Sequence, residues 1–164
     1  MTEALAELFE YNLWATATLI DGCREAPPEL LHARVGGVPD TVAALFTHLV
    51  GGQQTFALRT KGRQHEGELN RRSPFPGWDE LARIAEQSGR ELLAAARTCE
   101  GHETVGLAWQ GQTSVLPLRF ILAHAIEHAT EHRTEIKIAL GLQGFATPDL
   151  DGWNYAAARS YGAN

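Results

Sequence analysis

The sequence predicts an all-α fold: a four-helix bundle with a small β-hairpin between the third and fourth helices. Four stretches carry apolar side chains at helical spacing, which is typical of amphipathic helices. Alternation of apolar with polar or small residues, which is typical of strands, is confined to residues 103–118, so we expect no larger sheet. At 164 residues the chain has the size of one domain, and we expect a single domain over residues 1–164.

The first helix is expected from about Thr2 to Asp21. Polar Asn12 and Thr16 interrupt its apolar stripe, while Gly22 weakens its end and Pro27-Pro28 predict a loop. The stripe is formed by Leu5, Leu8, Phe9, Leu19 and Ile20.

The second helix is expected to begin at Asp40 or Thr41, either of which can cap it, and to run to about Arg59. The third follows the proline-rich segment Pro74 to Trp78, with Asp79 near its first turn. The expected buried faces are Val42, Leu45, Leu49 and Phe56 on the second helix, and Leu81, Ile84, Ala85, Leu92 and Cys99 on the third.

Residues 103–118 are expected to form the hairpin, with Gln110-Gly111 as its turn. Pro117 then opens the long fourth helix, which ends near Gly141. The tail is expected to hold one short helix after Pro148. A bundle is the natural way to bury four such helices, but the long linkers after the second and third leave their packing order open.

Composition excludes several classes of protein. The net charge of −6 and the pI of about 5.6 argue against wrapping nucleic acid, which requires clustered positive charge. A local basic segment, residues 61–72, fits either a solvated loop or an anion-attracting lip over a site. No apolar run approaches the roughly 18 residues of a membrane span, and the first residues do not resemble a signal peptide. We therefore expect a cytoplasmic protein without a membrane partner.

The two cysteines, Cys23 and Cys99, are too few for a disulfide framework and lack metal-ligand spacing. We expect both to be reduced residues of the core.

Three histidines, His124, His128 and His132, recur at every fourth position of the fourth helix. The outer two are about 12 Å apart along the axis, too far to share an ion whose bonds to nitrogen are about 2.0–2.1 Å long. At about 100° per residue, His128 and His132 fall within the apolar stripe and His124 at its edge. The inward pair is therefore His128 and His132, with their Cβ atoms about 5–6 Å apart.

A third ligand should come from another helix. Of the other histidines, only His48 lies in a predicted helix, at the edge of its apolar face; His32, His65 and His102 fall in expected loops. The alternative is a buried polar network, although burying imidazoles without partners costs about 1–3 kcal/mol each. The residues favour a metal site and leave the network open.

Several segments together resemble the DinB/YfiT-like metalloenzyme superfamily of four-helix bundles. They are YNLWA (11–15), TVAALFTHL (41–49), HAIEHATEHRTEI (124–136), LGLQG (140–144) and DLDGWNY (149–155). The family's metal site has one histidine on the second helix and a pair four residues apart on the fourth, the second of which is commonly followed by arginine. The resemblance therefore implies His48, His128 and His132 as ligands, with Arg133 as the following arginine.

The sequence departs from the family pattern around the last ligand. Glu131 stands where many members carry another histidine, and Thr134-Glu135 stands where Gly-Gln is common. Glu135 follows His132 by about one turn on the same side. It can act as a general base, as a partner that orients a histidine ligand, or as a solvated charge, and we favour the last two.

The resemblance also implies a function. Three imidazoles leave an open position on a divalent ion, Zn²⁺ by default, with Ni²⁺ or Fe²⁺ as alternatives. Characterised relatives use the site with low-molecular-weight thiols, as S-transferases or a maleylpyruvate isomerase, and a related domain serves in thiol-histidine biosynthesis. We therefore expect a metal-dependent transferase that directs a thiol such as bacillithiol, mycothiol or glutathione at an electrophile.

Further residues near the ligands are candidates for substrate binding. Arg59, Arg63 and Arg133 can hold carboxylates of the cosubstrate, and Asn12 and His124 are further candidates beside the site. Two rival functions use the same ligands: a metal-binding stress-response module without turnover, and a metal-dependent hydrolase in which Glu135 assists. By analogy with similar bundles, we expect a homodimer.

Overall fold

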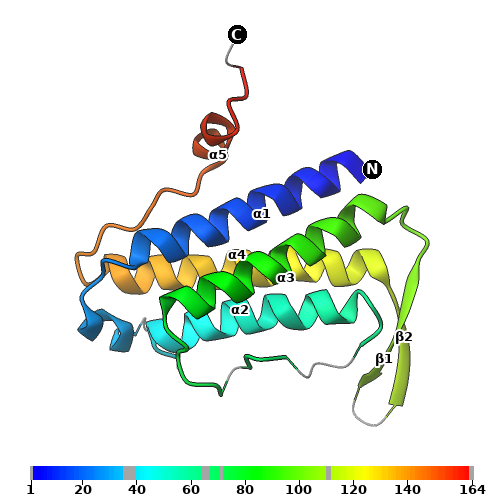
Figure 1. Ribbon diagram of the computed structural model, residues 1–164, viewed down its shortest axis with the longest axis horizontal. Helices are drawn as coiled ribbons and strands as arrows, with labels where there is room; N and C mark the ends of the chain where they lie inside the picture. Colours follow the sequence, from blue (N-terminus) through cyan, green and yellow to red (C-terminus); the bar gives the residue numbers. More distant parts are fainter. Residues whose placement is uncertain (1, 35–39, 64–66, 71, 110–111, 163–164) are drawn as a thin grey trace.

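Four long helices run side by side along the molecule (Figure 1). The computed structural model describes residues 2–34, 40–63, 67–70, 72–109 and 112–162. Helix α1 spans Thr2–Cys23, α2 Val42–Arg59, α3 Trp78–Thr98 and α4 Leu118–Gly141. The predicted all-α class is confirmed. None of the helices in these described ranges is long and apolar enough to cross a membrane.

The helix ends follow local chemistry. The Thr41 hydroxyl caps α2 by accepting a hydrogen bond of 3.2 Å from the Ala44 amide. Helix α1 continues through Gly22 to Cys23, two residues beyond the predicted end. A Cβ at Gly22 would lie 2.1 Å from Cγ of Pro148, so glycine is needed here for the tail to pack against α1.

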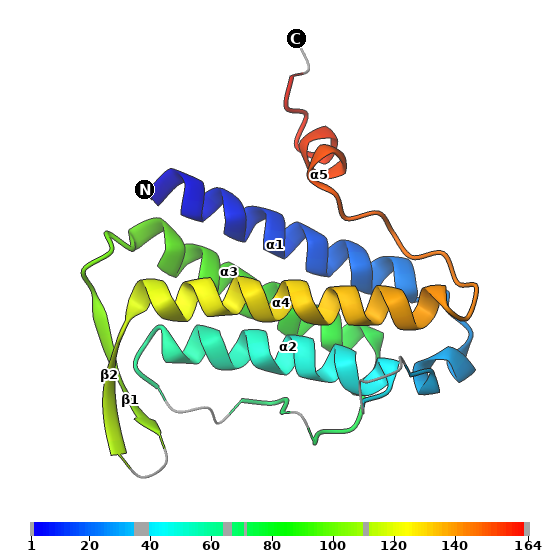
Figure 2. The same cartoon turned by 180° about the vertical axis from the view of Figure 1, so that it is seen from behind.

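The predicted hairpin is confirmed. Strand β1, Thr104–Trp109, pairs antiparallel with β2, Gln112–Pro117, with Val105 opposite Leu116. The expected turn at Gln110-Gly111 lies outside the described residues. Pro117 ends β2 and is also the N-cap of α4, so the hairpin leads directly into that helix (Figure 2).

Two short helices complete the chain. A 3₁₀ helix, η1, spans Pro28–His32 where a loop was expected; proline suits the first turn of a helix, and the Leu30 amide donates to the Pro27 carbonyl at 2.9 Å. The short helix expected after Pro148 is α5, Gly152–Ala158. It lies beside α1 and away from the other long helices (Figures 1 and 2).

Packing around the bundle follows the order α1, α3, α2, α4, so α2 packs against α3 and α4. Phe9, Leu19 and Ile20 of the predicted stripe on α1 are buried, but Leu8 is 49% exposed. Placing Leu8 with the stripe was wrong, because it lies on the edge that faces solvent. Cys23 and Cys99 are buried and free, as predicted.

Among the described residues, Arg133 is the only charged residue that is buried, at 3% exposed. Its guanidinium donates to Asn12 Oδ1 at 2.6 Å and to Thr16 Oγ1 at 3.0 Å, and lies 5.9 Å from the centre of the Tyr11 ring. Burial lowers the pKa of Arg133 to about 10. The two polar residues that interrupt the stripe on α1 therefore bind a cation of α4 and fix how these helices face each other.

Replacing Asn12 by alanine removes a neutral acceptor from this buried cation. Hydrogen bonds to charged groups contribute about 1.5–3 kcal/mol, and we expect Asn12→Ala to lower the free energy of unfolding by about that amount. Urea denaturation of the metal-free protein measures it. The control Asn154→Ala, at an exposed position of α5, should change stability by less than about 0.5 kcal/mol. Equal stability of the two variants would contradict the role assigned to Asn12.

Candidate metal centre

Three histidines converge between α2 and α4. One nitrogen each of His48, His128 and His132 lies within 4.8 Å of the other two. The ring centres are 4.9 Å apart for His48 and His128, 4.5 Å for His48 and His132, and 4.4 Å for His128 and His132. All three residues are half-buried. The structure thus brings together one histidine of α2 and the inward pair of α4.

The three histidines meet because the residues that face each other on α2 and α4 recur at the same four-residue spacing. On α2, His48, Gly52 and Phe56 recur every fourth residue, as the three histidines do on α4. The helices are antiparallel, because His48 lies against His132 whereas Phe56 lies against His124 at 4.8 Å between ring centres. Sequence reasoning placed Phe56 only in the core and gave Gly52 no role, although the shared four-residue spacing was the signal that could have linked them to the site.

Gly52 permits the close approach of the two helices. A Cβ at this position would lie 2.2 Å from His128 Cε1 and 2.7 Å from its Nε2. Such contacts are closer than side chains tolerate, so the imidazole of His128 occupies space that any other residue at position 52 would need.

Burial of His128 favours its neutral imidazole, which is the form that binds metal ions. Burial lowers the pKa of His128 to about 3, assisted by the proximity of His132, His48 and His124. A tetrahedral ion with bonds of about 2.0–2.1 Å needs its ligand nitrogens about 3.4 Å apart. The three histidine nitrogens lie within 4.8 Å of one another, so this triad could hold a divalent ion after small side-chain movements.

Glu135 contacts His132 on the side of its ring that carries Nδ1. Its Oε2 lies 2.6 Å from Nδ1 of His132, and both side chains are mostly buried, at 21% and 13% exposed. This contact leaves Nε2 of His132 for an ion. A carboxylate in this position orients a histidine ligand and increases its basicity.

Two of the remaining candidates, His124 and Arg59, lie near the triad, each beside Phe56. His124 is exposed and lies between the rings of Phe56 and Phe120, one turn of α4 away from His128. Arg59 is half-buried, with its guanidinium 5.7 Å from the centre of the Phe56 ring. Desolvation lowers the pKa of Arg59.

The three other candidates lie elsewhere. Arg63 is exposed and lines a separate cavity of about 230 Å³ between α2 and α3. Arg133 and Asn12 bind each other in the core between α1 and α4. The structure therefore leaves Arg59 as the candidate arginine next to the rings around the triad.

The other histidines lie apart from the triad. His32 ends η1 and is exposed, whereas His65 lies outside the described residues. His102 is exposed and 3.8 Å from Glu100. With Glu100 and Glu103 it forms a second group with possible ligands, but two of Glu103's acceptor contacts are already made with the amides of Glu100 and Gly101.

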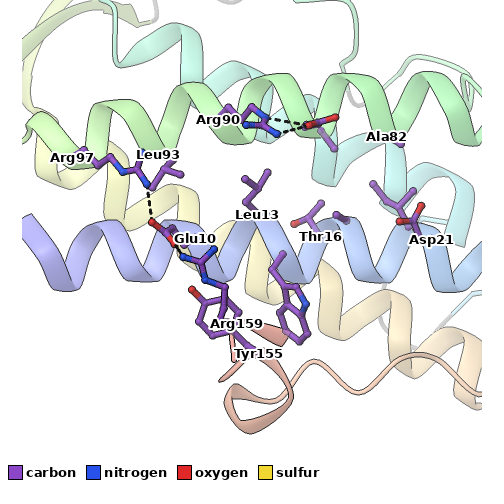
Figure 3. A pocket seen from close by; sticks show the side chains of 15 residues that line it. Glu10, Leu13, Thr16, Asp21, Ala82, Arg90, Leu93, Arg97, Tyr155 and Arg159 are labelled. Carbon is purple, nitrogen blue, oxygen red and sulfur yellow. Dashed lines mark hydrogen bonds and ion pairs between the residues drawn. The ribbon is translucent and has the colours of Figure 1, made fainter. Parts of the chain in front are cut away.

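A larger cavity, of about 560 Å³, lies between α1, α3 and α5 (Figure 3). Glu10, Arg97 and Arg159 form ion pairs at one end, and Tyr155 borders it from α5. None of the described residues that line it is a histidine. The histidine triad, which brings together groups capable of chemistry, is therefore the stronger candidate site despite the size of this cavity.

Substitution of Gly52 tests the geometry of the triad. We expect Gly52→Ala to displace His128 and to weaken metal binding by about 10-fold to 100-fold, as loss of a supporting group does in other metal sites. The fold itself should persist, because alanine is the better helix former. Titration with Co²⁺ measures the affinity. Gly141→Ala, where an added Cβ meets nothing within 4 Å, is the control; equal affinities in both variants would contradict this geometry.

The lowered pKa of His128 also predicts a pH dependence of stability. Between about pH 3 and pH 6.5 the unfolded chain binds a proton at His128 that the folded chain does not. The stability of the metal-free protein should therefore rise with pH through this window and fall as the pH is lowered. Urea denaturation at pH 4.5 and pH 7 should give a smaller pH dependence for His128→Gln than for wild type. The same pH dependence in both would contradict burial of a neutral imidazole.

Comparisons with known proteins agree on the family. The model of the DinB family matches residues 1–161. The crystal structure of a DinB-like protein from Bacillus cereus superposes with a TM-score of 0.66 at 17% sequence identity, covering 90% of this chain and 95% of that chain. No curated protein was found to match. The structural likeness supports the fold, and the family model spans nearly the whole sequence. The resemblance drawn from the motifs is thereby confirmed, and the chain belongs to the DinB family.

Proposed function

We propose that this protein is a metal-dependent transferase that acts with a low-molecular-weight thiol of the bacillithiol, mycothiol or glutathione type. The observation that carries the proposal is a triad of half-buried imidazoles to which the described residues add no fourth ligand. Three protein ligands and an open position are typical of catalytic zinc sites. Zn²⁺ is the first choice of ion, and Ni²⁺ or Fe²⁺ also suit imidazole ligands.

A bound divalent ion would supply a site at which the cosubstrate sulfur is held as thiolate. In the transfer, the S–H bond is broken, the proton passes to solvent, and a new S–C bond forms while the leaving group departs with its electron pair. His48, His128 and His132 would hold the ion, and the contact of Glu135 with Nδ1 of His132 leaves Nε2 for it. Arg59, beside Phe56, is placed to attract a carboxylate of the cosubstrate.

The proposal includes a cytoplasmic protein that forms a homodimer. Support for pairing comes from apolar side chains exposed on α1 and α5: Leu8 is 49% exposed and Trp153 83% exposed. A second copy that covered them would remove apolar surface from water.

The two rival functions, a hydrolase and a metal-binding module, would use the same three histidines but would differ in the role of Glu135. A metal-dependent hydrolase would need its carboxylate as a base, whereas Oε2 is engaged by His132 at 2.6 Å. A metal-binding module without turnover needs only the three histidines. The contact of Glu135 therefore supports a positioning role and favours the transferase over the hydrolase.

Metal content and thiol binding test the proposal together. Wild type and His124→Ala should each retain about one ion per chain, whereas His48→Ala, His128→Ala and His132→Ala should lose it, because two ligands hold an ion weakly. Adding glutathione or 2-mercaptoethanol to the Co²⁺-loaded protein should produce a thiolate charge-transfer band. Glu135→Gln should weaken metal binding by about 10-fold to 100-fold and keep the band at saturating Co²⁺.

Each rival predicts a different result. Saturable metal binding with no spectral effect of any thiol would favour the module. Hydrolysis that is lost in Glu135→Gln, with thiol binding intact, would favour the hydrolase. A wild-type protein that cannot be loaded with metal would overturn the proposal, and the histidines would then be polar groups of the core.

A further inference from the structure

A row of aromatic rings leads away from the triad along α4. Ring centres are 4.4 Å apart for His132 and His128, 5.4 Å for His128 and Phe56, 4.8 Å for Phe56 and His124, and 5.9 Å for His124 and Phe120. Four of the five rings come from α4 at four-residue spacing, and Phe56 of α2 fills the gap between His128 and His124. We call these five residues the ring row.

Exposure is highest at the end of the ring row that lies away from the triad. Phe56 is 4% exposed and His128 is half-buried, whereas His124 is exposed and Phe120 is 51% exposed. The outer end therefore presents ring surface to solvent, although exposed large apolar side chains cost free energy when nothing covers them. A phenylalanine and an imidazole packed together on the surface form a continuous apolar area at a fixed distance from the three ligands.

The distances define what would bind there. Successive α4 residues of the ring row are about 6 Å apart along the helix axis, so Phe120 is about 12 Å from His128 in that direction. A molecule with sulfur at the triad and an aromatic group two carbons away would place its ring beside His124. The Arg59 guanidinium, 5.7 Å from the centre of the Phe56 ring, is close enough to attract an anionic substituent.

We infer that the ring row is a subsite for a flat apolar group, and that His124 and Phe120 select ligands carrying an aryl group. This inference rests on the proposed function for the position of the sulfur, and it adds the chemical class of the second substrate part. Neither residue touches the reacting atoms. Both act on specificity, because aromatic pairs contribute favourable contacts when ring centres lie about 4.5–7 Å apart.

Two thiols of similar acidity test this inference. The Co²⁺-loaded protein is titrated with 2-phenylethanethiol and with 2-mercaptoethanol, and the charge-transfer band gives both affinities. We expect the phenyl compound to bind at least about 10-fold more tightly to wild type. His124→Ala should reduce this ratio by about threefold to tenfold, the value of one aromatic contact. Phe120→Ala, which removes the ring packed 5.9 Å from that of His124, should reduce the ratio by a smaller factor, and Co²⁺ affinity should be unchanged in both variants.

Ile138→Ala is the matched control. Ile138 is also an apolar residue of α4, 47% exposed, but it lies beyond the triad and outside the ring row. Its substitution should leave the ratio unchanged. Phe56 is too deeply buried for a clean test, since alanine there would open the core. A ratio that is the same in wild type, His124→Ala and Phe120→Ala would overturn the inference.

A metal-free measurement separates this inference from the proposed function. If neither thiol gives a charge-transfer band, the proposed function fails, and 2-phenylethanol then probes the ring row directly. Ring-current shifts of the His124 imidazole protons in wild type, reduced in Phe120→Ala and kept in Ile138→Ala, would support the subsite. No shift in wild type at saturating solubility of the probe would overturn it.

Discussion

The close approach of α2 to α4 at Gly52 is the constraint on which the rest of the site depends. Because position 52 has no side chain, the imidazole of His128 lies directly over α2. That contact buries the ring and keeps it neutral. It also sets the register in which His48 meets His132 at one end and Phe56 meets His124 at the other. The absence of a side chain at position 52 thus allows both the burial of His128 and the alignment of the three histidines.

Much of the fold was predictable because it depends on local patterns. The helical period of apolar residues predicted the four long helices, and alternation with a turn signal predicted the hairpin. The pair His128 and His132 followed from the angle each residue makes with the apolar stripe. The packing order was not predictable, because it depends on contacts between segments joined by long linkers. The 3₁₀ turn at Pro28–His32 was missed because the same prolines suit a loop and a helix start.

Arg133 illustrates the limit of reading a site from sequence. Its neighbour His132 faces α2, and one residue turns a helix by about 100°, so the guanidinium faces α1 instead. Its partners Asn12 and Thr16 were visible as polar interruptions of an apolar stripe. Nothing in the spacing linked them to a residue more than a hundred positions away, and only the packed structure does so. Glu135, by contrast, lies one turn from His132, and its contact with that ring is a local consequence of helix geometry.

The charges around the triad are consistent with an anionic fourth ligand. Neutral imidazoles contribute no charge, and the carboxylate of Glu135 contributes one negative charge beside His132. A divalent ion would leave one positive charge in a half-buried site. A thiolate would cancel that charge, which matters because an uncompensated charge is costly where water is scarce. The electrostatic balance therefore suits an anionic fourth ligand, such as a thiolate or a hydroxide.

The burial of Arg133 would affect which metal ions the histidine triad can bind. A helix can change the arrangement of its ligands by rotating or sliding, but rotation of α4 would pull a buried cation away from Asn12 and Thr16. Helix α1 therefore restricts rotation of α4 and of the histidines on it. The angles between the three imidazoles would then be fixed, and ions that require a different coordination geometry would be disfavoured. If the triad holds an ion, selectivity for the metal would then depend on residues of α1 that lie away from the triad.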